Sequence, residues 1–280
     1  MIKDTTRSTA YPRPGRSDLP FYLGLGLLSG VYVFLIVAML VADASYTSPS
    51  ELWRALASRE IRFAIKLSLI SCSLATLLSL WVAVPMGYLM SRHRFPGRGL
   101  VDVIVDIPIV LPPLVVGLSL LILMQTGLGK LVERHVAVTY AVPSVILAQF
   151  SVACAFAVRT MRVTFDQINP RGEQVALTLG CSRSQAFWWV ALPEARRGVL
   201  TAATIAWARA LGEFGPILVF SGATRMKTEV LSTTVFLELS IGHLEAAVAV
   251  SLLMIMVAAA VLLLVRWLGS EGAFGKAAEP

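Results

Sequence analysis

Long apolar runs separated by short polar segments dominate the 280 residues of this chain. A helix needs about 20 mostly apolar residues to cross a bilayer, and five runs reach this length without a charged residue, while a sixth contains only Arg209 and Glu213. The six runs are 19–42, 67–90, 107–129, 136–158, 198–221 and 246–265. None shows the alternation of a barrel strand. The pattern therefore predicts an all-α, polytopic membrane bundle with six transmembrane helices.

The composition agrees with a lipid environment. Charged residues make up 15% of the chain, whereas a soluble domain carries about 25%, so a surface facing water could not be covered. The formal net charge of +7 could suggest nucleic-acid binding. In membrane proteins, however, surplus Lys and Arg collect in cytoplasmic loops. We therefore expect membrane lipid, and no nucleic acid, as a partner.

The distribution of Lys and Arg predicts the orientation. With the N-terminus inside, the cytoplasmic segments hold fifteen basic residues and the opposite side holds eight, which favours cytoplasmic N- and C-termini. The predicted organisation is an N-terminal tail, a transmembrane domain with one sizeable cytoplasmic loop, and a C-terminal tail. Their ranges are 1–18 for the first tail, 19–268 for the domain, 159–197 for the loop and 269–280 for the second tail.

No catalytic or metal-binding pattern emerges from the sequence. Cys72, Cys154 and Cys181 lack metal-ligand spacing, and the three histidines fall in different loops without a nucleophile–base arrangement. The phosphate-binding motif Gly-x4-Gly-Lys-Ser/Thr does not occur in the chain. We therefore expect a chain that is not an enzyme, has no cofactor or metal, and depends on another chain for any use of ATP.

The predicted cytoplasmic loop contains two short helices around a glycine turn. Asn169 can cap a first helix and Pro170 suits its first position, and Gly180 is a natural C-terminal stop. Ser182 and Gln185 then have the spacing of a capping box, which begins a second helix.

The end of this second helix is expected at Leu192-Pro193, after Trp188 and Trp189. The pair of helices has two interpretations. It could lie in the membrane interface with both tryptophans among the lipid headgroups, or it could protrude and dock into a groove of a partner protein. Composition alone does not choose between them.

The loop resembles the "EAA" loop of ABC importer permeases. Gly180, then nine residues, Val190, one residue and Leu192-Pro193 match the Gly-x9-Ile/Val-x-Leu-Pro half of that motif. The Glu-Ala-Ala half stands here as Gln174-Val175-Ala176, with Glu173 one position earlier, so either Glu173 or Gln174 could make the polar contact with an ATPase. The resemblance assigns the coupling role to Glu173, Gln174, Ala176, Gly180, Ser182, Leu192 and Pro193.

Two further segments resemble molybdate, tungstate and sulfate permeases. Residues 108–117, Pro-Ile-Val-Leu-Pro-Pro-Leu-Val-Val-Gly, are similar to the third-helix segment of that group, and 208–215, Ala-Arg-Ala-Leu-Gly-Glu-Phe-Gly, to the fifth-helix segment. Kinked helices of this kind suit a pathway that opens and closes. The candidate pathway and gate residues are Pro108, Pro112, Pro113, Gly117, Arg209, Glu213 and Gly215.

The resemblance implies a type I ABC importer permease in the cytoplasmic (inner) membrane of a bacterium or archaeon. Its partners would be a second permease copy, as a homodimer or a related pair, two ABC ATPase subunits, and a periplasmic or lipid-anchored solute-binding protein. The implied cargo is molybdate or tungstate, or sulfate. Ferric iron or a polyamine is the alternative cargo. An ion-coupled secondary transporter is the alternative class, but it would predict inverted repeats, which the sequence lacks.

Charged residues near the apolar runs leave two questions open. Arg209 and Glu213 lie four residues apart on one helix face, so they could form a structural ion pair, or Arg209 could attract a passing anion. Asp102 and Asp106 are also four apart. They could interact with the dipole of a helix N-terminus, or contact the basic residues Arg92, Arg94 and Arg98.

Overall fold

The structure is a computed structural model that describes residues 19–274, and this range contains helices and connecting loops without a strand. The predicted N-terminal tail, 1–18, lies outside the described residues, as does the second half of the predicted C-terminal tail, 275–280. The chain divides into two units, Met1–Ser48 and Pro49–Pro280. The prediction of an all-α fold is confirmed.

The described part of the first unit, residues 19–48, contains one helix, α1 (Leu19–Tyr46). It has 28 residues, which exceeds the length needed to cross a bilayer, and none of its side chains is buried. Most leucine, valine, phenylalanine and tyrosine side chains on this helix are more than half exposed. Such a surface is stable in lipid and not in water.

The second unit contains all the other helices. Their bounds are α2 (Pro49–Ala57), α3 (Arg59–Arg92), α4 (Arg98–Val110), α5 (Pro113–Gln125), α6 (Gly127–Glu133), α7 (Val142–Gln167), α8 (Arg171–Thr178), α9 (Arg183–Ala186), the π-helix η1 (Phe187–Ala191), α10 (Leu192–Glu194), α11 (Arg196–Leu211), α12 (Gly215–Ser221), α13 (Leu231–Ser240) and α14 (Leu244–Phe274).

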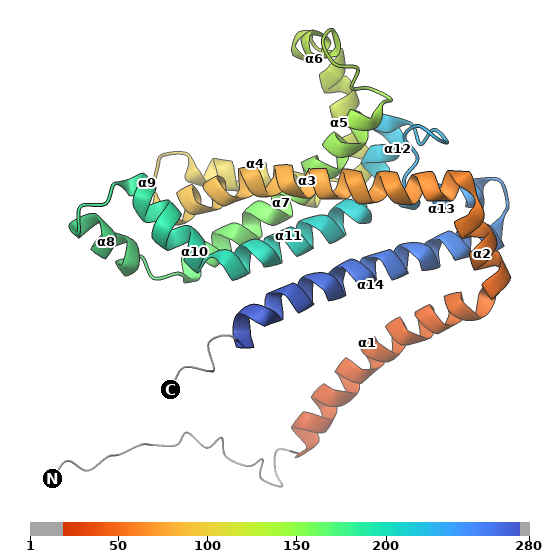
Figure 1. The fold of residues 1–280 in the computed structure, drawn as a ribbon, viewed down its shortest axis with the longest axis horizontal. Coiled ribbons are helices and arrows are strands. Elements are labelled where there is room, and N and C mark those ends of the chain that lie inside the picture. The colour runs from red at the N-terminus through yellow and green to blue at the C-terminus, as the bar shows by residue number, and fades with distance from the viewer. Residues whose placement is uncertain (1–18, 275–280) are drawn as a thin grey trace. The chain divides into compact units, whose positions relative to one another are not determined.

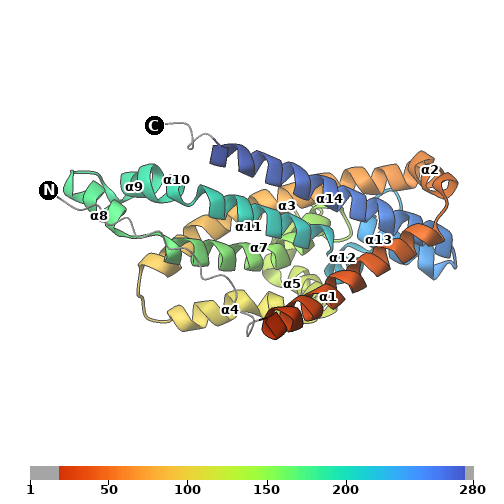
Figure 2. The same cartoon turned by 90° about the horizontal axis from the view of Figure 1, so that it is seen from below.

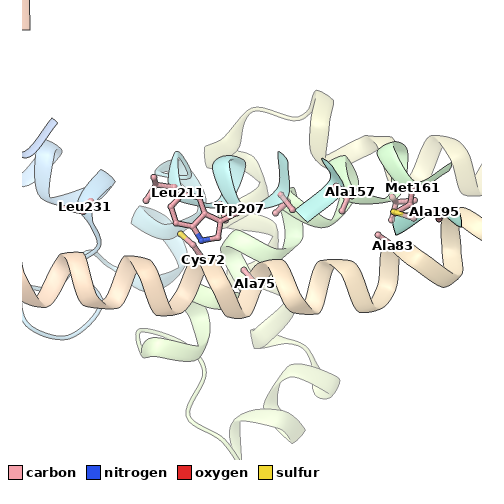
Figure 3. Packing of buried hydrophobic residues seen from close by; sticks show 14 of the residues in the cluster. Cys72, Ala75, Ala83, Ala157, Met161, Ala195, Trp207, Leu211 and Leu231 are labelled. Carbon is pink, nitrogen blue, oxygen red and sulfur yellow. The ribbon is translucent and has the colours of Figure 1, made fainter. Parts of the chain in front are cut away.

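The centre of this unit is formed by α3, α7 and α11, which run side by side (Figure 1). Small side chains line their contacts and let the backbones approach closely, as the alanines and Cys72 in Figure 3 show. At Gly87 a Cβ atom would lie 2.8 Å from the Cβ atom of Met161, so α3 and α7 touch at a position that accepts only glycine. Trp207 and Leu211 fill the wider part of the core (Figure 3).

Four described helices are long and apolar enough to cross a membrane, namely α1, α3, α7 and α14 to Val265. Two bent pairs raise the number to six: α4 and α5 meet at 113°, and α11 and α12 meet at 60°. Both bends occur where the sequence predicted interrupted helices. Pro108, in contrast, lies inside α4, and the break comes after Val110.

Several helices do not begin or end where their apolar runs do. The third span does not begin at 107, because α4 already starts at Arg98. The fourth begins at Val142, because the backbone N–H groups of Val138 and Thr139 donate to the Glu133 carboxylate and hold the preceding segment in a loop. It then continues to Gln167, past the end of its apolar run.

The two ends of the second unit differ in structure. In both views α8, α9 and α10 lie at one end of the bundle, and α2 and α13 lie at the other (Figures 1 and 2). The predicted cytoplasmic loop, 159–197, and the helices α2 and α13, which fall in segments expected on the other side of the membrane, are therefore at opposite ends.

Candidate functional site: a protruding loop and two interrupted helices

Residues 169–194 lie at one end of the second unit, and we call them the protruding loop. The first half of the protruding loop has the predicted helix and glycine turn. The Asn169 Oδ1 atom accepts a hydrogen bond from the Arg171 N–H at 3.0 Å at the start of α8. At its end Gly180 has a φ of 92°, and the Cys181 N–H donates to the Ala176 carbonyl at 3.0 Å. This 6→1 bond is the Schellman pattern, which needs a left-handed residue after the helix.

The second half of the loop begins as predicted but ends differently. The Ser182 and Gln185 side chains form both hydrogen bonds of the capping box. Leu192-Pro193, however, does not end the helix. The chain widens into η1, where the Leu192 N–H bonds to the Phe187 carbonyl, and it continues as α10 to Glu194. A π-turn absorbs one extra residue, which accommodates a proline that lacks an N–H group.

Glu173 points into the protein. Its side chain is 10% exposed, and both carboxylate oxygens are used: Oε1 lies 2.9 Å from the Arg92 Nε atom, and Oε2 accepts from the Tyr88 hydroxyl at 2.6 Å. Gln174, the next residue, is exposed. Of the two candidates for a polar contact with a partner, only Gln174 is therefore accessible.

The outer face of the loop is largely apolar. Val175, Leu179 and Trp189 are 56%, 79% and 66% exposed, while Ala176 is buried on the inner side of α8. Ala176 and Glu173 are three residues apart and share the inner face. The loop thus has one face attached to the bundle and one apolar face without a covering element among the described residues.

The two interrupted helices meet where each is broken. A Cβ atom on Gly117 of α5 would lie 2.7 Å from the Pro216 Cα atom, and one on Gly215 would lie 2.8 Å from the Pro113 Cβ atom. The contact is reciprocal, because each helix presents a glycine to a proline of the other. Pro112 is the residue before α5, with extended backbone angles. The structure therefore brings Pro113, Gly117 and Gly215 together, with Pro112 next to Pro113 in the chain, and leaves Pro108 within α4.

Arg209 and Glu213 form an ion pair with 3.0 Å between Nη1 and Oε2. The Glu213 side chain is 1% exposed and that of Arg209 is 32% exposed. The Arg209 guanidinium also lies 5.7 Å from the centre of the Phe156 ring on α7, within the range of a cation–π contact. The structural ion pair is therefore present, and Arg209 keeps an exposed side.

The two aspartates of α4 pair with arginines of α7. Asp102 contacts Arg162, and Asp106 lies 3.2 Å from Arg159. The interpretation that they sit in the first turn of a helix is wrong, because α4 starts at Arg98 and has no acidic residue in its first turn. The alternative partners Arg92, Arg94 and Arg98 are not used in these pairs. No local pattern indicated directly that α7 would extend beyond its apolar run to supply both partners.

A groove of about 710 Å³ runs between α7 and α11 towards the protruding loop. Arg159 and Arg197 bring positive charge to it, Glu194 brings one negative charge, and threonine hydroxyls with apolar side chains complete the lining. The lining also includes Ile205 and Phe156. The Phe156 ring is the one that the Arg209 guanidinium contacts.

Residues 83–270 match the family described as "Binding-protein-dependent transport system inner membrane component". The sulfate transport system permease protein CysT of Escherichia coli is 31% identical over 258 residues, covering 91% of this chain and 92% of the relative. A probable molybdenum ABC transporter permease protein of Haloferax volcanii is 34% identical, covering 88% of this chain and 89% of the relative.

The chain is also similar to a third relative and to one solved structure. The molybdate/tungstate transport system permease protein WtpB of Pyrococcus furiosus is 30% identical and covers 90% of this chain and 95% of the relative. A chain of a bacterial alginate ABC transporter, solved in complex with an alginate-bound periplasmic protein, superposes with a TM-score of 0.71. It shares 18% identity and covers 89% of this chain and 93% of its own, so it supports the fold alone.

Proposed function

This chain belongs to the family of binding-protein-dependent transport system inner membrane components, and we propose that it is the permease of an ATP-driven importer for tetrahedral oxyanions. The observation that carries the proposal is similarity at 30% identity or more, over 88% or more of the chain, to permeases named for sulfate, molybdenum and molybdate/tungstate. These relatives favour an oxyanion over ferric iron or a polyamine. Molybdate or tungstate ranks ahead of sulfate in the proposal.

The protruding loop is proposed to couple this chain to two ABC ATPase subunits. Its exposed face, with Gln174, Leu179 and Trp189, is apolar with a polar edge, which suits insertion into a groove of a partner. The chain has no ATP-binding motif of its own, so the energy would enter through this contact. The loop and both termini would then lie in the cytoplasm, in agreement with the distribution of basic residues.

The anion pathway is proposed to run along the groove between α7 and α11. In the proposal a second permease copy would face this groove, and a solute-binding protein would deliver the cargo on the far side of the membrane. Arg159 and Arg197 line this groove and give it positive charge, and Arg209 lies outside the lining, against the Phe156 ring. Each is partly balanced by a carboxylate or open to solvent, which suits an anion that must be released again.

The proposal is tested with the complete complex. The chain would be co-expressed with the ATPase and solute-binding protein of its own operon, purified, and reconstituted in vesicles. ATP-dependent uptake of labelled molybdate, inhibited by unlabelled tungstate and more weakly by sulfate, is expected. Uptake of a metal cation or polyamine that these anions do not inhibit would refute the cargo, and failure of the chain to retain an ATPase would refute the importer.

A further inference from the structure

The inner side of the protruding loop is attached to the bundle at a cluster of three side chains, Tyr88, Arg92 and Glu173, which we call the Arg92 joint. The Glu173 carboxylate binds the Arg92 Nε atom at 2.9 Å and the Tyr88 hydroxyl at 2.6 Å. The Arg92 and Glu173 side chains are 13% and 10% exposed. Charge-assisted hydrogen bonds at such low exposure are stronger and less screened than those at a surface.

Arg92 also holds the end of a second membrane helix. Its Nη1 atom donates to the Phe165 carbonyl at 2.9 Å, and its Nη2 atom donates to the Ile168 carbonyl at 3.0 Å. Carbonyls at a helix end have no partner within the helix, and the planar guanidinium can bind them and a carboxylate at once. One side chain of α3 therefore contacts both the end of α7 and the first turn of α8.

An aromatic contact surrounds these polar bonds. The Tyr88 ring packs edge-to-face on Phe165 at 5.4 Å and on Phe187 at 4.7 Å between ring centres. Phe187 begins η1, so the joint also touches the second half of the loop. The principal packing neighbours of α8 itself are α9 and η1, which belong to the same loop. Among the described residues, the side-chain hydrogen bonds from α8 to a membrane helix are thus those of the Arg92 joint.

We propose that Arg92 and Glu173 are positioning residues for transport, and that the Arg92 joint transmits displacement of the loop to α3 and α7. The inference rests on the proposed function, in which an ATPase moves the loop. It assigns Glu173 to the interior of this chain and leaves the contact with the ATPase to the exposed face. A loop with a broken joint would still bind the ATPase, but its movement would be lost before it reached the pore.

The test separates assembly from coupling. In the reconstituted complex, ATP hydrolysis and molybdate uptake are measured on the same vesicles, and their ratio gives the anions transported per ATP. Glu173→Gln and Arg92→Lys should keep the ATPase bound and its hydrolysis active, while the ratio falls about tenfold, the factor expected for losing one charge-assisted hydrogen bond. Arg94→Lys, at an exposed position two residues away, is the matched control and should transport as the wild type does.

A milder variant protects the test against misfolding. Tyr88→Phe keeps the ring contacts and the ion pair and removes only the hydroxyl, so a smaller fall in the ratio is expected in a folded complex. An unchanged ratio in all three joint variants would overturn the proposal, and so would loss of the ATPase from the Glu173→Gln complex, since Glu173 would then face the partner. A wild-type chain that retains no ATPase would instead refute the proposed function.

Discussion

The crossing of α5 and α12 leads to a prediction about Gly215. In Gly215→Ala the new Cβ atom would lie 2.8 Å from the Pro113 Cβ atom and 3.0 Å from the Leu114 backbone N atom. Carbon atoms in favourable contact are about 3.5–4.0 Å apart. The two helices would have to separate by about 0.7 Å or more to reach that distance, and neither a proline ring nor a backbone atom can rotate away.

The cost follows from the geometry. Overpacking of a well-packed contact destabilises by about 1–3 kcal/mol, and the reciprocal contact of Gly117 with Pro216 prevents the helices from sliding to relieve it. If one pore conformation keeps this crossing and another loosens it, the same energy changes their ratio about 5–150-fold. We therefore expect Gly215→Ala to lower both the unfolding temperature of the purified complex and the rate of ATP-dependent anion uptake.

Gly212→Ala is the matched control. It lies three residues earlier, where a new Cβ atom would meet only the carbonyl oxygens of Ala208 and Arg209 at 3.7 and 3.9 Å, which is ordinary contact. Both variants exchange glycine for alanine near the same bend, so a difference between them reports the crossing. If Gly215→Ala unfolds and transports as the wild type does, the close approach of α5 and α12 is refuted.

Three further results are expected. Gly180→Val should lower the amount of ATPase that co-purifies, because the left-handed conformation at this position costs about 1–2 kcal/mol for valine. Nothing lies within 4 Å of the Cβ position, so Gly180→Asn, which tolerates this conformation, should restore binding. Equal loss of the ATPase in both variants would contradict this conformational explanation. Arg209→Met should destabilise by about 3–5 kcal/mol, because it leaves a buried carboxylate unpaired, and thermal unfolding should show that adding Glu213→Gln recovers most of the loss. Burial raises the pKa of Glu229, in the loop before α13. Wild-type stability should therefore fall relative to Glu229→Gln as the pH rises above the ordinary glutamate pKa of about 4.3. Parallel pH profiles of the unfolding temperature for the two proteins would refute this.

The sequence predicts the membrane helices and the local structure of the loop well, for physical reasons. Long apolar runs have few stable alternatives in lipid, and a capping box or a glycine stop depends on residues that are neighbours in the chain. These features are local. The positions of Gly180 and Ser182 in the structure follow directly from them.

Contacts between distant residues could not be predicted in the same way. The Arg92 and Glu173 side chains are 81 residues apart, and the reciprocal approach of Gly117 and Gly215 depends on two bends whose angles no local pattern determines. The extension of α7 through charged residues could not be predicted for a related reason. Apolarity predicts where a helix must lie in lipid, but ion pairs such as Arg159 with Asp106 stabilise the part that continues beyond it.

Residues of the loop motif therefore face in two directions, and its sequence does not separate them. Glu173 and Ala176 face inward and attach the loop to this chain, whereas Gln174 and Leu179 face outward. Since a helix turns by about 100° per residue, adjacent positions of one motif necessarily point in different directions. A carboxylate next to the expected position is consequently no substitute for it. In this chain the carboxylate completes the protein's own fold, and the neighbouring amide remains available to a partner.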